Sequence, residues 1–313
     1  MLLMNDARKI NVFEDVISLM TGMWPTPLVR LKNLSKEDEI WAKLEFYNPF
    51  SHSIKDRPVW YMMKKALEKG MLKDTLYEAT SGNVGISLSL QANHLGKKAK
   101  IFLPKGTPKY TIALLSIIGA DIVMTDFNVI DWSMINYVKD MAKRDNVTNL
   151  NQFENDANFE SHYEFTSKEL IDQIRYLGKK PKAVIAGIGT SGHIAAISIR
   201  IKEEFKDALV IGVQPFKGSK IPGIKRVETK PKWLEIAKID EVIDISREEA
   251  IKGVIEIARV EGLLVGMSSG AVYMAYKKIR SKLGKGLYIL IFPDDIFKYV
   301  EVIYDYLSKK KNV

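Results

Sequence analysis

The sequence predicts an α/β protein whose mostly parallel sheets are covered by helices. Short apolar runs rich in β-branched residues alternate with segments of helical periodicity over most of the 313 residues, and this alternation is typical of parallel sheets. A hydrophobic fraction of 46% and a charged fraction of 27% are typical of a globular protein. Because the chain is too long for a single small core, we expect about two domains.

We expect strands and helices to alternate along the chain. The strands are predicted at 39–45, 75–79, 98–104, 121–125, 182–186, 208–214, 241–245 and 287–292. The helices are predicted near 55–69, 83–95, 108–118, 131–144, 159–177, 191–205, 246–261, 269–282 and 295–308. The first ~40 residues, which contain "TPLVRL", should pack on one of the sheets as an N-terminal extension. Ligands of such sheets bind at the carboxyl ends of the strands, so the loops there should carry the site.

The composition narrows the classes of function. No apolar run reaches the roughly 20 residues of a membrane span, and the first residues lack the pattern of a secretory signal, so we expect a cytoplasmic protein with no membrane partner. The absence of cysteine excludes disulfides, thiolate catalysis and cysteine-ligated metals. The net charge of +9 comes from scattered lysines, which disfavours nucleic acid as a partner. The four histidines show neither metal-binding spacing nor clustering, so no metal is expected.

The most specific local pattern is "AVIAGIGTSGHIAAISIR", in which Gly187, Gly189 and Gly192 fit G-x-G-x-x-G between a strand and a helix. Backbone N–H groups at a helix N-terminus suit a phosphate. A dinucleotide site would also need an acidic residue at the end of the next strand, and Gln214 stands there. We therefore expect a phosphate but not NAD; the alternative is a glycine turn that only allows close helix packing.

Three further loops carry polar residues at strand ends or helix starts. In "EATSGNVGIS", Thr80, Ser81 and Asn83 offer donors that suit a carboxylate, or simply cap the next helix. Ser268 in "GMSSGAVYMA" is either a second cap or a ligand contact, and Gln152 in "NQFENDAN" either holds a ligand or closes a turn.

One lysine, Lys55 in "NPFSHSIKDRPVWYMM", follows a serine-rich turn at the start of a predicted helix. Most lysines are solvated surface charges. A phosphate cradle, a carboxylate cradle and a lysine are, however, what pyridoxal phosphate needs to act on an amino acid.

The order of these motifs resembles that of the cysteine synthases (O-acetylserine sulfhydrylases) and their cystathionine β-synthase relatives. The similarity runs from "PTPLVRL" to "IFPDD", nearly the whole chain, and "GSKIPGIKR" is most similar to B-type cysteine synthases and archaeal O-phosphoserine sulfhydrylases. The resemblance implies the tryptophan synthase β-like fold, with two open twisted sheets flanked by helices, and a homodimer. It also implies a smaller mobile domain at 45–150 that closes over the substrate, and a larger cofactor-binding domain at 1–44 plus 151–313.

The resemblance assigns roles to individual residues. Lys55 matches the Schiff-base lysine, Asn83 the contact of the cofactor's ring hydroxyl, and Ser268 the serine that faces the pyridine nitrogen. The phosphate loop is matched by Gly189, Thr190, Ser191, Gly192 and His193. Thr80, Ser81 and Gln152 match the residues that bind the substrate carboxylate. Lys225 and Arg226 match the residues that bind the phosphate of a phosphoserine substrate.

These roles imply β-replacement. L-cysteine would form from O-phospho-L-serine or O-acetyl-L-serine and sulfide through an aminoacrylate intermediate, with Lys55 as general base. The alternatives are a cystathionine β-synthase, a serine or threonine dehydratase, or a non-catalytic binding or regulatory homologue.

The chain departs from the family pattern at four places. The lysine loop is one residue longer than the common "NPAGS", and His52 replaces a glycine. Val84 stands where a threonine is frequent, and His193 replaces the usual threonine of the phosphate loop. "IFPDDIFKY" replaces the common "FPDSGERY".

Overall fold

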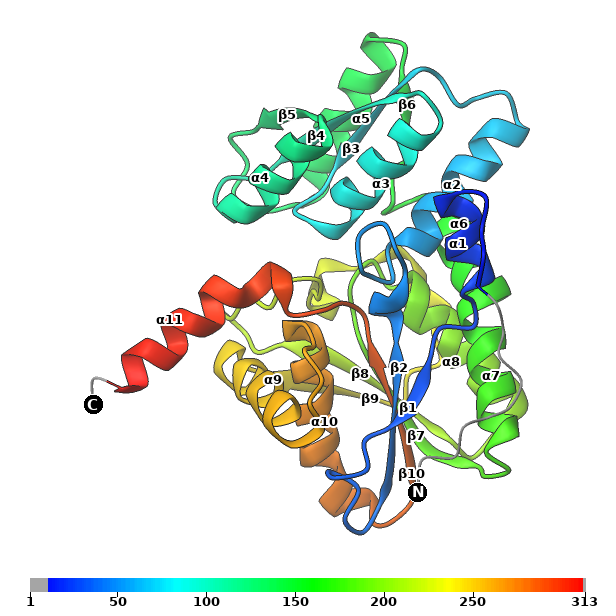
Figure 1. The fold of residues 1–313 in the computed structure, drawn as a ribbon, viewed down its shortest axis with the longest axis vertical. Helices are drawn as coiled ribbons and strands as arrows, with labels where there is room; N and C mark the ends of the chain where they lie inside the picture. The colour runs from blue at the N-terminus through cyan, green and yellow to red at the C-terminus, as the bar shows by residue number, and fades with distance from the viewer. Residues whose placement is uncertain (1–10, 312–313) are drawn as a thin grey trace.

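The computed structural model describes residues 11–311, which form two sheets (Figure 1). The larger sheet has the strand order β1(Leu28–Arg30)-β2(Glu39–Leu44)-β10(Leu287–Phe292)-β7(Pro181–Gly187)-β8(Leu209–Pro215)-β9(Glu241–Ile245). The smaller sheet has the order β5(Asp121–Met124)-β4(Lys98–Leu103)-β3(Thr75–Ala79)-β6(Thr148–Asn149). Neighbouring strands are parallel throughout except β1, which pairs antiparallel with β2. The predicted fold class is confirmed.

Helices cover both faces of each sheet. The described α-helices are α1(Val16–Gly22), α2(Asp56–Glu68), α3(Asn83–His94), α4(Lys109–Ile118), α5(Trp132–Arg144), α6(Asp156–Ser161), α7(Ser167–Tyr176), α8(Gly192–Glu204), α9(Arg247–Glu261), α10(Met267–Leu283) and α11(Val300–Lys311). One core of the large sheet packs against α9, α10 and α11, and the other against α7 and α8. The small sheet lies between a layer of α2, α3 and α4 and the single helix α5.

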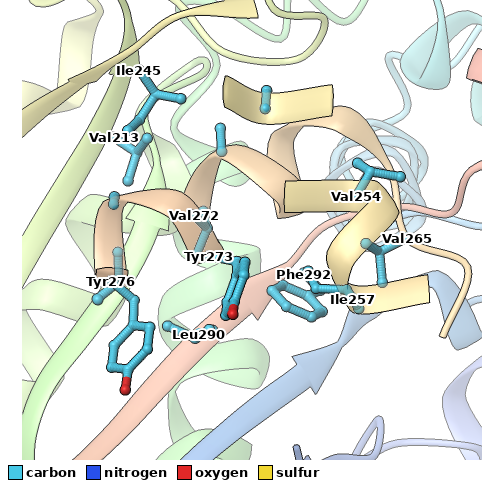
Figure 2. Close-up of a cluster of buried hydrophobic side chains, with 14 of the residues drawn as sticks. Val213, Ile245, Val254, Ile257, Val265, Val272, Tyr273, Tyr276, Leu290 and Phe292 are labelled. Atoms are coloured by element: carbon cyan, nitrogen blue, oxygen red, sulfur yellow. The ribbon is translucent and has the colours of Figure 1, made fainter. Parts of the chain in front are cut away.

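The sequence pattern explains these layers. In β7, Ala183 and Ile185 face the core under α9 and α10, whereas Val184 and Ala186 face α8. Every residue of β10 is buried for the same reason, because side chains on both faces of a central parallel strand are covered. Figure 2 shows the first of these cores, where side chains of the two helices meet those of β8, β9 and β10.

The eight predicted strands are present, and the N-terminal extension adds β1 at the edge of the large sheet. The single helix predicted at 159–177 is wrong in detail, because a π-helical turn at His162–Thr166 separates α6 from α7. The helix predicted from 295 begins only at Val300. Asp294 and Asp295 are extended because they form β-bridges with Ser53 and Val265, and a 3-10 turn at Phe297–Tyr299 then leads into the α-helix.

Two kinds of feature are absent from residues 11–311. No helix in this range is long and apolar enough to span a membrane, and no group of three or more His, Asp or Glu side chains there is arranged to hold a metal ion.

Candidate active site

Lys55 lies at the N-cap of α2, in the segment that follows β2 of the large sheet. The backbone on either side is fixed, because the Ile54 N–H donates to the carbonyl of Pro293 at 2.8 Å and the Lys55 N–H donates to Ser53 Oγ at 3.1 Å. The side chain itself is only partly buried. Lys55 is thus a lysine held by a rigid backbone.

The surroundings of Lys55 favour its neutral form. Burial lowers the pKa of its ammonium from 10.5 to about 8, and the carboxylates of Asp294 and Glu45 oppose that change. A neutral amine is the form that attacks a carbonyl, so this environment suits a nucleophilic lysine.

The loop before Lys55 is folded around the carboxylate of Asp56. This buried carboxylate accepts hydrogen bonds from the backbone N–H groups of Phe50 at 2.9 Å and Ser51 at 3.0 Å. His52, at the position of the family's glycine, has a φ of +48°, which is uncommon for a residue with a side chain. Lys298 secures this turn by donating to the carbonyls of Ser51 at 2.8 Å and His52 at 3.3 Å.

A buried network of charges lies on the other side of Asp56. The guanidinium of Arg57 is bound to Glu45 at 2.6 Å and to Glu169 at 2.7 Å, and its carbon lies 4.4 Å from the ring centre of Trp24. Lys43 also contacts Glu169, at 3.1 Å. Two cations therefore face two carboxylates, so the charges of these four side chains balance.

Asp294 forms hydrogen bonds both with Asn83 and with the residue that precedes α10. The Asn83 side chain at the start of α3 donates from Nδ2 to Asp294 Oδ2 at 2.9 Å. The N–H of Gly266, two residues before Ser268, donates to the backbone carbonyl of Asp294 at 2.9 Å. Because Asp294 also bridges Ser53, these contacts bring together the segments that carry Lys55, Asn83 and Ser268.

The glycine-rich loop leads into α8 as predicted. Ser191 has a φ of +72°, and its hydroxyl accepts the N–H of Trp233 at 3.0 Å, which stabilises this left-handed turn. A Cβ at Gly189 would lie 2.7 Å from the carbonyl oxygen of Gly223, so no side chain fits there. The first N–H groups of the 13-residue helix α8 thus follow a tight turn without side chains in the way.

His193, in the first turn of α8, is buried, and its Nε2 has no hydrogen-bond partner among the described residues. Burial lowers the pKa of its imidazole to about 3, and the nearby Lys55 charge acts in the same direction. The expectation that the histidines do not cluster is wrong here: the rings of His193 and His162 are 5.9 Å apart and nearly perpendicular. The two meet because α6 and the π-helical turn pack on α8, a contact distant in sequence.

The residues predicted for the substrate carboxylate lie on neighbouring loops. Gln152 Nε2 donates to the carbonyl of Ala79 at 3.1 Å, which places Gln152 beside Thr80; both are buried, whereas Ser81 is exposed. The buried carboxylate of Glu78 holds this loop by accepting the N–H of Gln152 at 3.3 Å. Burial raises the pKa of Glu78 to about 7, and its backbone hydrogen bonds oppose this.

Asn158 connects the two predicted cradles. Its Nδ2 donates to the carbonyl of Gln152 at 2.7 Å and to Thr190 Oγ1 at 3.2 Å. Its Oδ1 has no partner among the described residues, and a Cβ at Gly192 would lie 2.7 Å from it. The carboxylate loop and the phosphate loop therefore lie on opposite sides of one buried amide.

The two basic residues proposed for a phosphate differ in their surroundings. Lys225 lies beside the glycine loop; its Nζ donates to the carbonyl of Ile130 at 3.0 Å and lies 4.5 Å from the ring centre of Phe153. Burial lowers the pKa of Lys225 to about 8. Arg226 instead points to the large sheet, where Asp244 at 3.1 Å and a second carboxylate neutralise it. The structure does not place Arg226 beside the other predicted site residues.

Sequence reasoning did not select Asp294, Glu78 or Asn158, although each touches a predicted site residue. Of the three, only Asp294 could have been found from the sequence, because it lies in "IFPDDIFKY", which departs from the family pattern. Glu78 and Asn158 are the first residue of "EATSGNVGIS" and the last residue of "NQFENDAN", but local sequence does not show that their side chains turn toward a distant loop.

This arrangement fits pyridoxal phosphate. The turn at the start of α8 and the lysine of lowered pKa suit the phosphate and the aldehyde of this group, and the unpartnered His193 Nε2 is a buried polar atom that a ligand could satisfy. The match to the family model described as pyridoxal-phosphate dependent enzyme covers residues 19–294. The chain belongs to this family of enzymes, and its cofactor is pyridoxal 5′-phosphate.

Within that family, the chain is similar to the cysteine synthases. It is 33% identical to the cysteine synthase of Aquifex aeolicus over 88% of each chain. It is 32% identical to cysteine synthase B of Pseudomonas aeruginosa over 90% of this chain and 95% of that one. A hydrogen sulfide-producing enzyme from Fusobacterium nucleatum has a TM-score of 0.81 and 27% identity over 92% of this chain and all of its own. The predicted family and enzyme class are confirmed, and a non-catalytic homologue is no longer an alternative.

Proposed function

We propose that the protein makes L-cysteine from sulfide and a β-substituted L-serine, with O-acetyl-L-serine as the preferred donor. The reaction class is supported by Lys55, whose pKa is lowered by burial and whose charge acts on His193 in the predicted phosphate loop. The choice of donor is supported by Arg226, whose charge is already paired with two carboxylates.

We assign each residue of the site a binding or proton-transfer role. Thr80, Ser81 and Gln152 bind the carboxylate of the amino acid, and the turn before α8 binds the cofactor's phosphate. When bound, pyridoxal phosphate withdraws electrons from the substrate's α-carbon, so that a proton and then the β-substituent can leave. Lys55 would take the α-proton of the bound amino acid at Nζ. Ser268, in the first turn of α10, would hold the ring nitrogen.

A dianionic phosphate ester would need more cationic partners than this site supplies. Of the two basic residues, only Lys225 remains, and a lysine with a pKa of about 8 is a weaker counter-ion than a fixed guanidinium. O-acetyl-L-serine has no charge at its leaving group and needs no such partner.

The test is cysteine formation from sulfide with O-acetyl-L-serine and O-phospho-L-serine in parallel. We expect kcat/KM to be at least about tenfold higher for O-acetyl-L-serine, and Arg226→Ala to leave this ratio within about twofold. A preference for O-phospho-L-serine that Arg226→Ala abolishes would contradict the donor assignment. Pyruvate released without sulfide would indicate a dehydratase, and cystathionine formed with homocysteine would indicate a cystathionine β-synthase.

We also propose that two copies meet over an apolar groove of about 940 Å³ beside α7. The groove is lined by Trp24, Trp41, Trp60, Phe165 and Tyr176, and Tyr176 is 92% exposed. Aromatic surface of this extent is typical of protein interfaces. Light scattering should give the mass of a dimer, and Tyr176→Arg should give a monomer. A wild-type monomer at micromolar concentration would exclude this interface.

We also propose that residues 45–150 form a mobile smaller domain. A cytoplasmic location is likewise a proposal. The small sheet uses only residues 75–149, and the Lys225 contact with Ile130 joins it to the large sheet. Closure of this unit over bound amino acid should lower the radius of gyration in X-ray scattering. An unchanged value at saturating substrate would argue against closure.

A further inference from the structure

Asp294 is a buried carboxylate whose two oxygens are in different surroundings. Its side chain is 2% exposed. Oδ2 accepts from Asn83 Nδ2 at 2.9 Å and from the hydroxyl of Tyr299 at 2.5 Å. Oδ1 has no hydrogen-bond partner among the described residues and is packed against Gly266, where an added Cβ would lie 1.9 Å from it. Substitution at either Asp294 or Gly266 therefore disturbs the same contact.

The contact with Asp294 fixes which way the amide of Asn83 points. An ionised carboxylate only accepts hydrogen bonds, so the group that faces it must be the NH₂ of Asn83 and not its oxygen. One N–H of that NH₂ is used, and the other N–H and the Oδ1 atom remain for a ligand. Asn83 is only partly buried, in contrast to Asp294. An amide that would otherwise have two orientations of similar energy thus has one.

The backbone of Asp294 adds a second constraint. Asp294 bridges Ser53, two residues before Lys55, and its carbonyl accepts the N–H of Gly266, two residues before Ser268. The carboxylate also favours the charged form of Lys55. Three segments that are far apart in the sequence are therefore held by one residue.

We propose that Asp294 is a positioning residue that acts on the cofactor through Asn83: it holds the Asn83 amide with one N–H directed at the cofactor's ring hydroxyl. This inference rests on the cofactor site proposed above, but not on the identity of the donor or of the sulfur nucleophile. Asp294 thus has a role in cofactor binding beyond connecting parts of the fold.

The first test is a double-mutant cycle on cofactor affinity. Apo-protein is titrated with pyridoxal 5′-phosphate, and tryptophan fluorescence gives the Kd for wild type, Asp294→Asn, Asn83→Ala and the double variant. Loss of one well-oriented hydrogen bond predicts an increase in Kd of about tenfold for Asp294→Asn. Asp294→Asn should add less than about twofold in the Asn83→Ala background, because its effect passes through Asn83. Equal increases in both backgrounds would overturn the proposal, and Tyr299→Phe is the matched control, with an expected change below about threefold.

The second test separates orientation from structural support and does not depend on whether the single variants fold. In the exchange variant Asn83→Asp with Asp294→Asn, the pair keeps its charge and one N–H···O contact, but the donor and acceptor trade places. We expect the urea midpoint to stay near that of wild type, whereas the Kd for the cofactor remains at least about tenfold higher. An exchange variant that recovers both stability and affinity would show that Asp294 only supports the fold. Neither measurement uses cysteine formation, so a protein that binds the cofactor but makes no cysteine would refute the proposed function and leave this inference intact.

Discussion

The lowered pKa of Lys55 can be measured directly in the protein without cofactor. With a pKa of about 8, roughly one lysine in ten is neutral at pH 7, against roughly one in three thousand for a lysine at 10.5. The neutral fraction is therefore about 300 times larger at pH 7. Competitive acetylation with a trace of acetic anhydride, followed by mass spectrometry of the Lys55 peptide, reports this fraction as a function of pH.

The test depends on the shape of the pH profile and not on the absolute rate, because limited access to Lys55 lowers its acetylation rate equally at every pH. We expect the rate to rise tenfold per pH unit up to about pH 8 and then to level off. Nα-acetyl-lysine in the same tube serves as the reference amine. A Lys55 rate that keeps rising in parallel with this reference up to pH 10 would refute the view that burial outweighs the carboxylates of Asp294 and Glu45.

Three further predictions test the surroundings of Lys55. Arg57→Met should lower the free energy of unfolding by about 3–5 kcal/mol in urea, because it removes the ion pair of the buried Glu45 and leaves Glu169 with Lys43 alone; a loss below about 1 kcal/mol would contradict this. Gly189→Ala should abolish cofactor binding in equilibrium dialysis while the circular dichroism spectrum persists, since its Cβ needs space that a backbone carbonyl occupies. The KM for the amino-acid donor should rise as the pH falls below about 7, since protonation of Glu78 removes an acceptor that holds the carboxylate loop; a KM that stays flat down to pH 5.5 would exclude this role.

The parts of the fold that the sequence predicts are those whose signal is local. The strand "LYILIF" is buried along its whole length because it lies between two covered strands, and its composition shows this directly. Short elements lack such a signal. β6 has two residues and pairs only with β3, so its strand character depends on a partner about 70 residues away. The π-helical turn at His162–Thr166 likewise interrupts a stretch with helical periodicity throughout.

The same distinction applies to the site. Lys55, Asn83 and the glycine loop are recognisable because each lies in a motif whose spacing reflects local backbone geometry. The direction of a long side chain is not encoded in this way. Arg226 follows Lys225 in the chain, yet the two diverge because Asp244 lies on β9, beside the strand that precedes their loop. A pair of adjacent cations in a motif therefore does not predict a pair of cations in a site.

The charges around Lys55 explain how a lysine can be desolvated without destabilising its loop. Arg57 and Lys43 are buried close by, and two buried cations would make the site of Lys55 strongly positive if they were unpaired. Glu45 and Glu169 cancel that charge through contacts of 2.6–3.1 Å. Burial then remains the main influence on the pKa of Lys55, which lies at about 8. Removing either carboxylate should therefore affect the reactivity of a lysine that it does not touch.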